Sequence, residues 1–152
     1  MTKMICFDMD GTIADLYAVD GWLGKLRTED ASPYEEAAPM WDMVELGRVL
    51  NRLIDKGWEV RIISWLSMNS SEAYKQAVRQ AKIDWLKKYD FPYKTAHLVA
   101  YGTTKADCVR KYRPNAILID DNSKVRQGWT LGETINPREE NIIETLKFLL
   151  DN

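Results

Sequence analysis

The sequence predicts an α/β fold with a central parallel sheet. Short apolar runs alternate with longer stretches in which apolar residues recur at helical spacing. Strands that are separated by helices pair in parallel and are joined by right-handed crossovers. The chain has 152 residues, enough for one domain with its own core, and it shows no repeat, low-complexity segment or linker. We therefore expect residues 1–152 to form a single three-layer domain.

Four apolar runs are the predicted strands. The first, Met4–Phe7, is apolar throughout, as expected of a strand that is buried on both faces of a parallel sheet. The other three predicted strands are Glu59–Ser64, His97–Tyr101 and Ala116–Ile119. Each pair of successive runs is separated by a predicted helix, which is why we expect the strands to be parallel.

Helical spacing and end signals predict three helices between these strands. Residues 42–56 place apolar side chains on one face. Ser70 or Ser71 is a typical cap for the long helix that follows. A third helix is expected to start at Thr104 and must end before the Arg113-Pro114 pair, because proline disfavours a helical residue before it.

The last helix and one irregular segment complete the chain. Residues 136–139 read Asn-Pro-Arg-Glu, which places a cap residue, a first-turn proline and a third-position glutamate, so we expect the last helix to begin there. Residues 16–39 contain glycines and prolines and are expected to be a small insert with a short helix or two. Three of its aromatic residues, Tyr17, Trp22 and Tyr34, are candidates to shape a substrate pocket.

Composition excludes some classes of protein. The net charge of −2 gives no reason to expect nucleic-acid binding from bulk charge alone. Cys6 and Cys108 fit no zinc motif, and we expect two reduced thiols. No apolar run approaches membrane-spanning length, and Asp8 interrupts any apolar leader, so we expect a cytoplasmic protein without a signal peptide or a membrane partner.

Paired carboxylates follow two of the predicted strands. Asp8 and Asp10 come directly after the first strand, and Asp120 and Asp121 directly after the fourth. The carboxyl ends of parallel strands lie at one edge of the sheet, where open α/β sheets hold their ligands. Carboxylates this close repel one another unless a cation or a proton separates them. The sequence therefore predicts a site for a divalent cation such as Mg²⁺.

Two further strand ends carry polar residues that suit phosphoryl transfer. Ser64 ends the second strand and could donate a hydrogen bond to a phosphoryl oxygen, and Lys105 lies one turn beyond the third strand. Lys105 would oppose the dipole of a helix that starts at Thr104, which favours a role in offsetting negative charge over a surface position. A carboxylate can attack phosphorus, and a second carboxyl group can protonate the leaving oxygen and then activate water.

These residues, in this order, resemble the motifs of haloacid dehalogenase (HAD) superfamily phosphatases. The first motif matches residues 8–12, Asp-Met-Asp-Gly-Thr, and the fourth matches Asp120-Asp121. The second and third motifs are the single residues Ser64 and Lys105, which are weak alone. The resemblance spans nearly the whole chain and implies a Rossmann-like fold. The presence of Asp10 favours phosphate esters, because the family's dehalogenases lack a carboxylate there.

The resemblance also implies roles for the site residues. Asp8 would be the nucleophile, Asp10 the general acid and base, and Lys105 a catalytic cation. Mg²⁺ would be held by the Asp8 side chain, the Asp10 backbone carbonyl and the last acidic pair, with Asp121 in direct contact and Asp120 acting through water. The residues predicted to contact the substrate are Gly11, Thr12, Ser64 and Trp65.

The expected substrate is a small phosphorylated molecule, either a nucleotide or another phosphometabolite. Trp65 follows Ser64 and could stack on a base, or it could pack against the insert. The small insert and the Asp-Asp motif are similar to 5'(3')-deoxyribonucleotidases and to the phosphatase domain of polynucleotide kinases, although the insert is smaller than the nucleotidase cap and should leave the site open. A 3'-phosphatase on nucleic-acid ends and a non-catalytic phospho-ligand-binding protein are the alternatives. No P-loop is present, so kinase activity is not expected.

Other proteins that use acidic clusters fit less well. An EF-hand loop that started at Asp8 would have Ile13 in place of its glycine and Val19 in place of its last glutamate. A receiver domain also uses acidic residues and a lysine, but its acidic pair comes first and its acceptor aspartate lies between that pair and the lysine. His97, the only histidine, is expected to be structural because no nucleophile is placed to use it.

Overall fold

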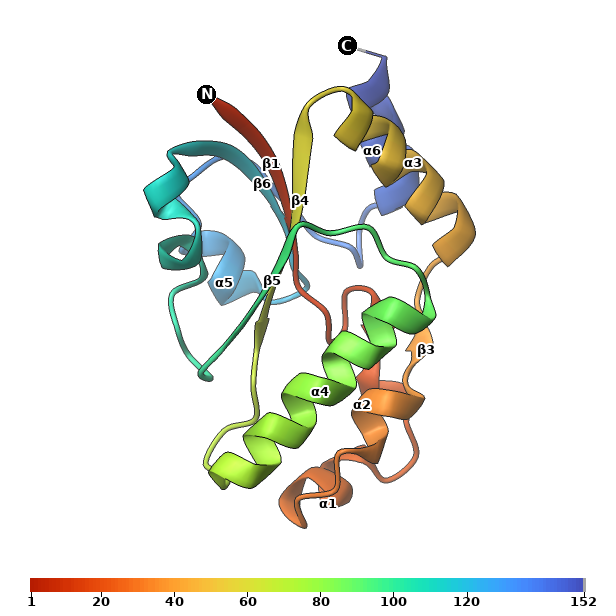
Figure 1. The fold of residues 1–152 in the computed structure, drawn as a ribbon, viewed down its shortest axis with the longest axis vertical. Coiled ribbons are helices and arrows are strands. Elements are labelled where there is room, and N and C mark those ends of the chain that lie inside the picture. Colours follow the sequence, from red (N-terminus) through yellow and green to blue (C-terminus); the bar gives the residue numbers. More distant parts are fainter. Residues whose placement is uncertain (152) are drawn as a thin grey trace.

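Five parallel strands form the central sheet of the protein. The structure is a computed structural model and describes residues 1–151. The strand order in the sheet is β5-β4-β1-β6-β7, and Figure 1 labels β1, β4, β5 and β6. The strands are β1 (Thr2–Phe7), β4 (Trp58–Trp65), β5 (Thr95–Val99), β6 (Pro114–Ile119) and β7 (Thr134–Ile135). The α/β fold and the four predicted strands are confirmed. The fifth, β7, was not predicted, because two residues are too short a run to show a strand pattern.

Strand β1 lies at the centre of the sheet and pairs with β4 on one side and β6 on the other. Its residues 4–7 have no exposed surface. Ile5 and Phe7 face the larger of two apolar clusters, and Met4 and Cys6 face the smaller one. A strand that packs on both faces needs apolar side chains at every position, which explains the uninterrupted apolar run in the sequence.

Helices cover both faces of the sheet. On one face, the larger cluster includes side chains of α3 (Met43–Asp55), α4 (Glu72–Lys88) and α6 (Ile142–Leu150). The other face is covered by α5 (Ser123–Gln127) and by two 3-10 helices, η2 (Lys105–Cys108) and η3 (Arg110–Tyr112). In Figure 1 these two groups lie on opposite sides of β1, which gives the three layers expected from the sequence.

The predicted starts of α3 and α4 are confirmed by their caps. The Asp42 side chain accepts hydrogen bonds from the backbone N–H groups of Val44 and Glu45, which would otherwise lack partners. The Ser71 side chain accepts one from the N–H of Tyr74, so Ser71 rather than Ser70 caps α4. Both caps are local contacts within three residues, which is why the sequence alone could place them.

Two predicted helices differ in the structure. The helix expected from Thr104 is instead the two short 3-10 helices, and Arg113 ends the second with a left-handed φ of 49°. The last helix begins at Ile142 and is capped by Asn141, not by Asn136. Asn136 caps only a local turn, by accepting from the N–H of Arg138, because the apolar residues that drive the helix into the core do not begin until Ile142.

The insert folds into short helices at the carboxyl end of the sheet. It contains η1 (Leu16–Ala18), α1 (Trp22–Arg27) and α2 (Ser32–Glu36), and its ends pair as a two-stranded antiparallel ribbon of β2 (Ala14–Asp15) and β3 (Ala38–Pro39). Figure 1 shows α1 and α2 beside α4, at the end of the molecule away from both termini. The insert is therefore placed to cover the edge of the sheet where β1, β4 and β6 end.

Hydrogen bonds tie the insert to the start of α4. The Tyr74 hydroxyl donates to the backbone oxygen of Asp30 at 3.0 Å, and the Glu29 carboxylate accepts from the N–H and the hydroxyl of Ser71. These contacts fix the insert against a helix that itself packs on the sheet. Within residues 1–151, no helix has the length and apolar character needed to cross a membrane.

Candidate active site

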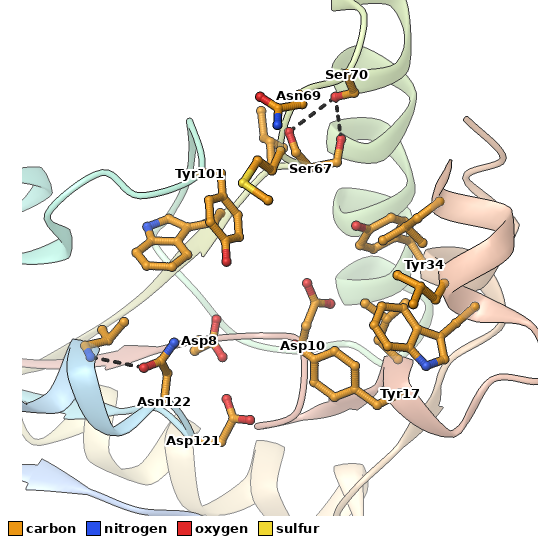
Figure 2. A pocket seen from close by; sticks show the side chains of 18 of the residues that line it. Asp8, Asp10, Tyr17, Tyr34, Ser67, Asn69, Ser70, Tyr101, Asp121 and Asn122 are labelled. Carbon is orange, nitrogen blue, oxygen red and sulfur yellow. Dashed lines mark hydrogen bonds between the residues drawn. The ribbon is translucent and has the colours of Figure 1, made fainter. Parts of the chain in front are cut away.

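Most of the predicted functional residues surround one cavity at the carboxyl edge of the sheet. The cavity has a volume of about 800 Å³. Figure 2 shows Asp8, Asp10 and Asp121 on one side of it, Tyr101 across from them, and Tyr17 and Tyr34 on the side of the insert. The predicted residues that line it are Asp8, Asp10, Trp65, Lys105, Asp120 and Asp121. The structure brings these residues together, and their roles stay predictions.

Lys105 connects two of the carboxylates. Its Nζ donates to Asp8 Oδ1 at 3.0 Å and to Asp120 Oδ2 at 2.7 Å, and the residue is only 4% exposed. Burial alone would lower the pKa of Lys105, but the two carboxylates outweigh burial and raise the pKa above its ordinary value. Lys105 is therefore an ammonium held between the ends of β1 and β6.

Three carboxylates are close enough to share one cation. Asp8, Asp120 and Asp121 each offer an oxygen, and these oxygens lie within 4.8 Å of one another. Burial, followed by repulsion from Asp8, raises the pKa of both Asp120 and Asp121 to about 6. A close set of carboxylate oxygens that repel one another is the kind of donor set that Mg²⁺ prefers, and a bound divalent cation would relieve the repulsion. The residues present therefore fit the metal that the sequence predicted.

Gly11 and Thr12 hold this acidic group in place. The Thr12 hydroxyl donates to Asp8 Oδ2 at 3.1 Å and accepts from the N–H of Asp121 at 3.2 Å. Gly11 has a φ of 79°, and a Cβ there would clash with the Asp121 carboxylate and lie 2.9 Å from the Tyr17 ring. Of the described residues, Gly11, Thr12 and Ser64 do not line the cavity, so their predicted contact with substrate stays untested.

A second buried lysine, Lys82, was missed by the sequence analysis. It belongs to α4 and is 1% exposed, and its Nζ donates to Asp10 Oδ2 at 3.0 Å, to Ser64 Oγ at 2.6 Å and to the backbone oxygen of Trp65 at 2.8 Å. The ammonium also lies 5.2 Å from the centre of the Tyr34 ring of the insert. The available signal was its position: the helical spacing that marked the inward face of α4 places Lys82 among apolar residues.

Asp10 is set apart from the other carboxylates by this lysine. Its side chain is 19% exposed and faces Lys82. Burial raises the pKa of Asp10 above its ordinary value, and the charge of Lys82 partly offsets that effect. Asp8 and Asp10 thus lie two positions apart but have different cationic partners, Lys105 and Lys82.

Aromatic side chains form two walls of the cavity. On the sheet side, Trp65 packs against Tyr101 with ring centres 4.9 Å apart, and its Nε1 donates to the backbone oxygen of Thr103 at 2.9 Å. On the insert side, Tyr17 and Trp22 meet edge to face at 5.0 Å. Trp65 therefore packs on the loop after β5 and lines the cavity, and its stacking on a substrate stays a prediction.

His97 lies outside this cavity, as a structural residue would. Its Nε2 is 3.2 Å from Arg61 Nη1. Because an arginine can only donate, Nε2 must accept, which requires the neutral imidazole. Burial, together with the charges of Arg61 and Lys111, lowers the pKa of His97.

Comparison with known proteins places the fold. No protein-family model and no curated protein matches the sequence. A chain in the Pnkp1/Rnl/Hen1 complex matches with a TM-score of 0.61 and 18% identity, over 90% of this chain and 46% of that one. A chain in a second structure of this RNA repair complex matches with a TM-score of 0.61 and 17% identity, over 90% of this chain and 42% of that one. D,D-heptose 1,7-bisphosphate phosphatase from Burkholderia thailandensis matches with a TM-score of 0.51 and 14% identity, over 87% of this chain and 75% of that one.

This chain has the same fold as these three matched chains. The Rossmann-like α/β fold that the HAD resemblance implied is therefore confirmed. Identities of 14–18% show the fold and not the activity. The chain spans about half the length of the first two chains, which are 46% and 42% covered.

Proposed function

We propose that this chain is a phosphatase, a Mg²⁺-dependent phosphomonoester hydrolase that works through an aspartyl-phosphate on Asp8. The observation that carries the proposal is that two carboxylates at the end of β1 have separate lysine partners. Lys105 holds Asp8, and Lys82 holds Asp10. Neighbouring carboxyl groups with different surroundings can take different roles, one as nucleophile and one as acid and base.

In the first step, the Asp8 carboxylate attacks phosphorus and the bond between phosphorus and the ester oxygen breaks. The protonated carboxyl group of Asp10 gives its proton to the departing oxygen, which leaves as an alcohol. Lys105 lies 3.0 Å from Asp8 Oδ1 and offsets part of the negative charge that builds up as the phosphate approaches. The product of this step is a phosphorylated Asp8.

In the second step, the Asp10 carboxylate accepts a proton from water, and the oxygen of that water attacks the phosphorus. The bond between phosphorus and the Asp8 oxygen breaks, which releases inorganic phosphate and restores the Asp8 carboxylate. Asp10 ends the cycle protonated, ready for the next ester. Asp10 therefore donates a proton in the first step and accepts one in the second.

Mg²⁺, when bound, neutralises charge between the carboxylates and the phosphoryl oxygens. We assign it to Asp8, Asp121 and the Asp10 backbone carbonyl, with Asp120 acting through water. Both Asp120 oxygens are already engaged, one by Lys105 at 2.7 Å and one by the Asn122 N–H at 2.9 Å. Asp121 has longer contacts, with Thr12 at 3.4 Å and with Arg138 at 3.3 Å, so its oxygens are easier to redirect to a cation.

The favoured substrate class is a nucleotide or another small phosphometabolite. A cavity of about 800 Å³ is of the size that holds small ligands. Its facing aromatic walls, Trp65 with Tyr101 and Tyr17 with Trp22, offer surfaces for a flat group such as a base. A polynucleotide 3'-phosphatase is the second candidate, because the fold is shared with a chain of an RNA repair complex. We treat residues 16–39 as the substrate-specificity cap of the single domain.

A phosphate-release assay with Mg²⁺ tests the proposal. The panel should contain nucleoside monophosphates, sugar phosphates, an oligonucleotide with a 3'-phosphate, and para-nitrophenyl phosphate. Release from the small molecules supports the favoured class, and release from the oligonucleotide alone supports the second candidate. Binding of phosphorylated ligands without turnover of any panel member would show a non-catalytic protein and contradict the proposal.

A further inference from the structure

Lys82 is a charged residue at a buried position, where its desolvation is unfavourable. Its neighbours on the inward face of α4 include Val78, Ala81 and Trp85, and an apolar side chain there would satisfy the packing of the helix. Burying an ammonium costs several kcal/mol unless it is paired and hydrogen-bonded. All three donors of Lys82 are in use, on Asp10, on Ser64 and on a backbone carbonyl. Two of these three acceptors are side chains that the sequence predicted for the site.

The hydrogen bond to Ser64 fixes the direction of the serine proton. An ammonium has donors and no acceptor, so Ser64 Oγ must accept from Lys82 at 2.6 Å. The hydroxyl proton of Ser64 is then left to donate to another group. A neutral side chain at position 82 would leave Ser64 free to rotate.

The hydrogen bond to Asp10 fixes the carboxyl group in the same way. Lys82 Nζ binds Asp10 Oδ2 at 3.0 Å, which leaves Oδ1 as the oxygen that can exchange a proton with the substrate. Lys82 is held by the rigid helix α4 and by the end of β4, through the Trp65 carbonyl at 2.8 Å. The carboxyl group of Asp10 therefore has one supported orientation.

We propose that Lys82 is a positioning residue of this site, which aims the Asp10 carboxyl group at the leaving oxygen. The proposal rests on the proposed function, because it assigns Lys82 to the general-acid step of that reaction. Through its contact with Tyr34, 5.2 Å from the ring centre, Lys82 also connects this arrangement to the insert.

Leaving groups of different quality separate this role from a merely structural one. A general acid matters most when the departing oxygen is a poor leaving group, such as an alkoxide, and least when it is a nitrophenolate. Lys82→Met keeps the length of the side chain and removes the charge and the donors. We expect kcat/KM to fall at least about a hundredfold for an alkyl phosphate and less than about tenfold for para-nitrophenyl phosphate. Equal losses on both substrates, or no loss on either, would overturn the proposal.

Two further variants complete the experiment. Lys87→Met removes an exposed lysine of the same helix and should leave kcat/KM unchanged for both substrates. Lys82→Arg keeps the charge, so it is the variant to use if Lys82→Met does not fold. Because a planar guanidinium places its donors differently from an ammonium, we expect a smaller loss that is still selective for the alkyl phosphate. A uniform loss in Lys82→Arg would also overturn the proposal.

The wild-type protein separates this inference from the proposed function. If the wild type releases phosphate from no member of the panel with Mg²⁺, the proposed function is wrong, and the inference about Lys82 falls with it. If the wild type is active and Lys82→Met shows no preference between leaving groups, the inference alone is wrong.

Discussion

Replacing Lys105 by Met tests how much the buried ion pairs contribute to stability and to activity. The change keeps the aliphatic stem and removes the charge that bridges Asp8 and Asp120 at 3.0 and 2.7 Å. Two effects on folding oppose each other. Removing a cation from the start of a helix would stabilise the helix by about 0.3–1 kcal/mol. Breaking a buried ion pair by removing one partner destabilises the protein by about 3–5 kcal/mol.

The structure decides which effect is larger. Lys105 starts a 3-10 helix of four residues, so the dipole it opposes is short, and it is only 4% exposed. We therefore expect Lys105→Met to lower the free energy of unfolding by about 3–5 kcal/mol in EDTA. Mg²⁺ should recover part of the loss, because a second cation then compensates the same carboxylates. We expect kcat/KM to fall at least a hundredfold, roughly 2.7 kcal/mol of transition-state stabilisation.

Urea unfolding with and without Mg²⁺, and kinetics on para-nitrophenyl phosphate, measure both effects on the same protein. The exposed-lysine variant Lys87→Met is the control and should behave as the wild type. A Lys105→Met protein of unchanged stability and near-normal activity would show that the buried pairs contribute neither to the fold nor to the site, contrary to this prediction.

Three more measurements follow from the geometry. Adding Mg²⁺ to EDTA-treated protein should raise its melting temperature and start hydrolysis, because the Asp8–Asp120–Asp121 oxygens lie within 4.8 Å of one another; no change in either would remove the metal site. Trp65→Ala should weaken nucleotide substrates by about 1–3 kcal/mol more than para-nitrophenyl phosphate if the ring stacks on a base, whereas equal losses in kcat/KM would indicate packing. The single imidazole resonance should titrate below the ordinary pKa of 6.5, since the pKa of His97 is lowered in the fold. The contribution of His97 to stability is then complete above pH 6.5 and is lost as the pH falls through the folded pKa. The stability of a His97→Asn variant should not show this loss at low pH. A pKa at or above 6.5 would contradict the Arg61 contact.

Local signals explain what the sequence could predict. Asp42 and Ser71 cap helices through contacts within three residues, and the apolar run of β1 reflects burial on both faces, so each could be identified from neighbouring residues. The prediction that Asn136 caps the last helix was wrong, and the local pattern could not prevent the error, because Asn136 and Asn141 have equally suitable cap patterns. The two differ in the apolar residues that follow, which only the packing of α6 on the core decides.

Lys82 shows why part of the site could not be predicted. Its partners Ser64 and Asp10 lie 18 and 72 positions away along the chain. In the sequence, a lysine within the apolar stripe of a helix looks like an interruption of the pattern. Only the crossing of α4 over the ends of β1 and β4 makes it an ion pair. By contrast, the motif residues after β1 and β6 could be predicted, because parallel strands place their carboxyl ends at the same edge of the sheet.

In the proposed mechanism, Asp8 is phosphorylated during turnover. The most direct measurement is mass spectrometry of the enzyme, quenched in acid during turnover of para-nitrophenyl phosphate with Mg²⁺ and digested at low pH. We predict a phosphoryl group on the peptide that contains Asp8, absent in EDTA and absent in an Asp8→Asn variant of native circular dichroism and no activity. An Asp8→Asn protein that hydrolyses the substrate within tenfold of the wild-type rate, or a phosphoryl group on a different residue, would contradict the proposed mechanism.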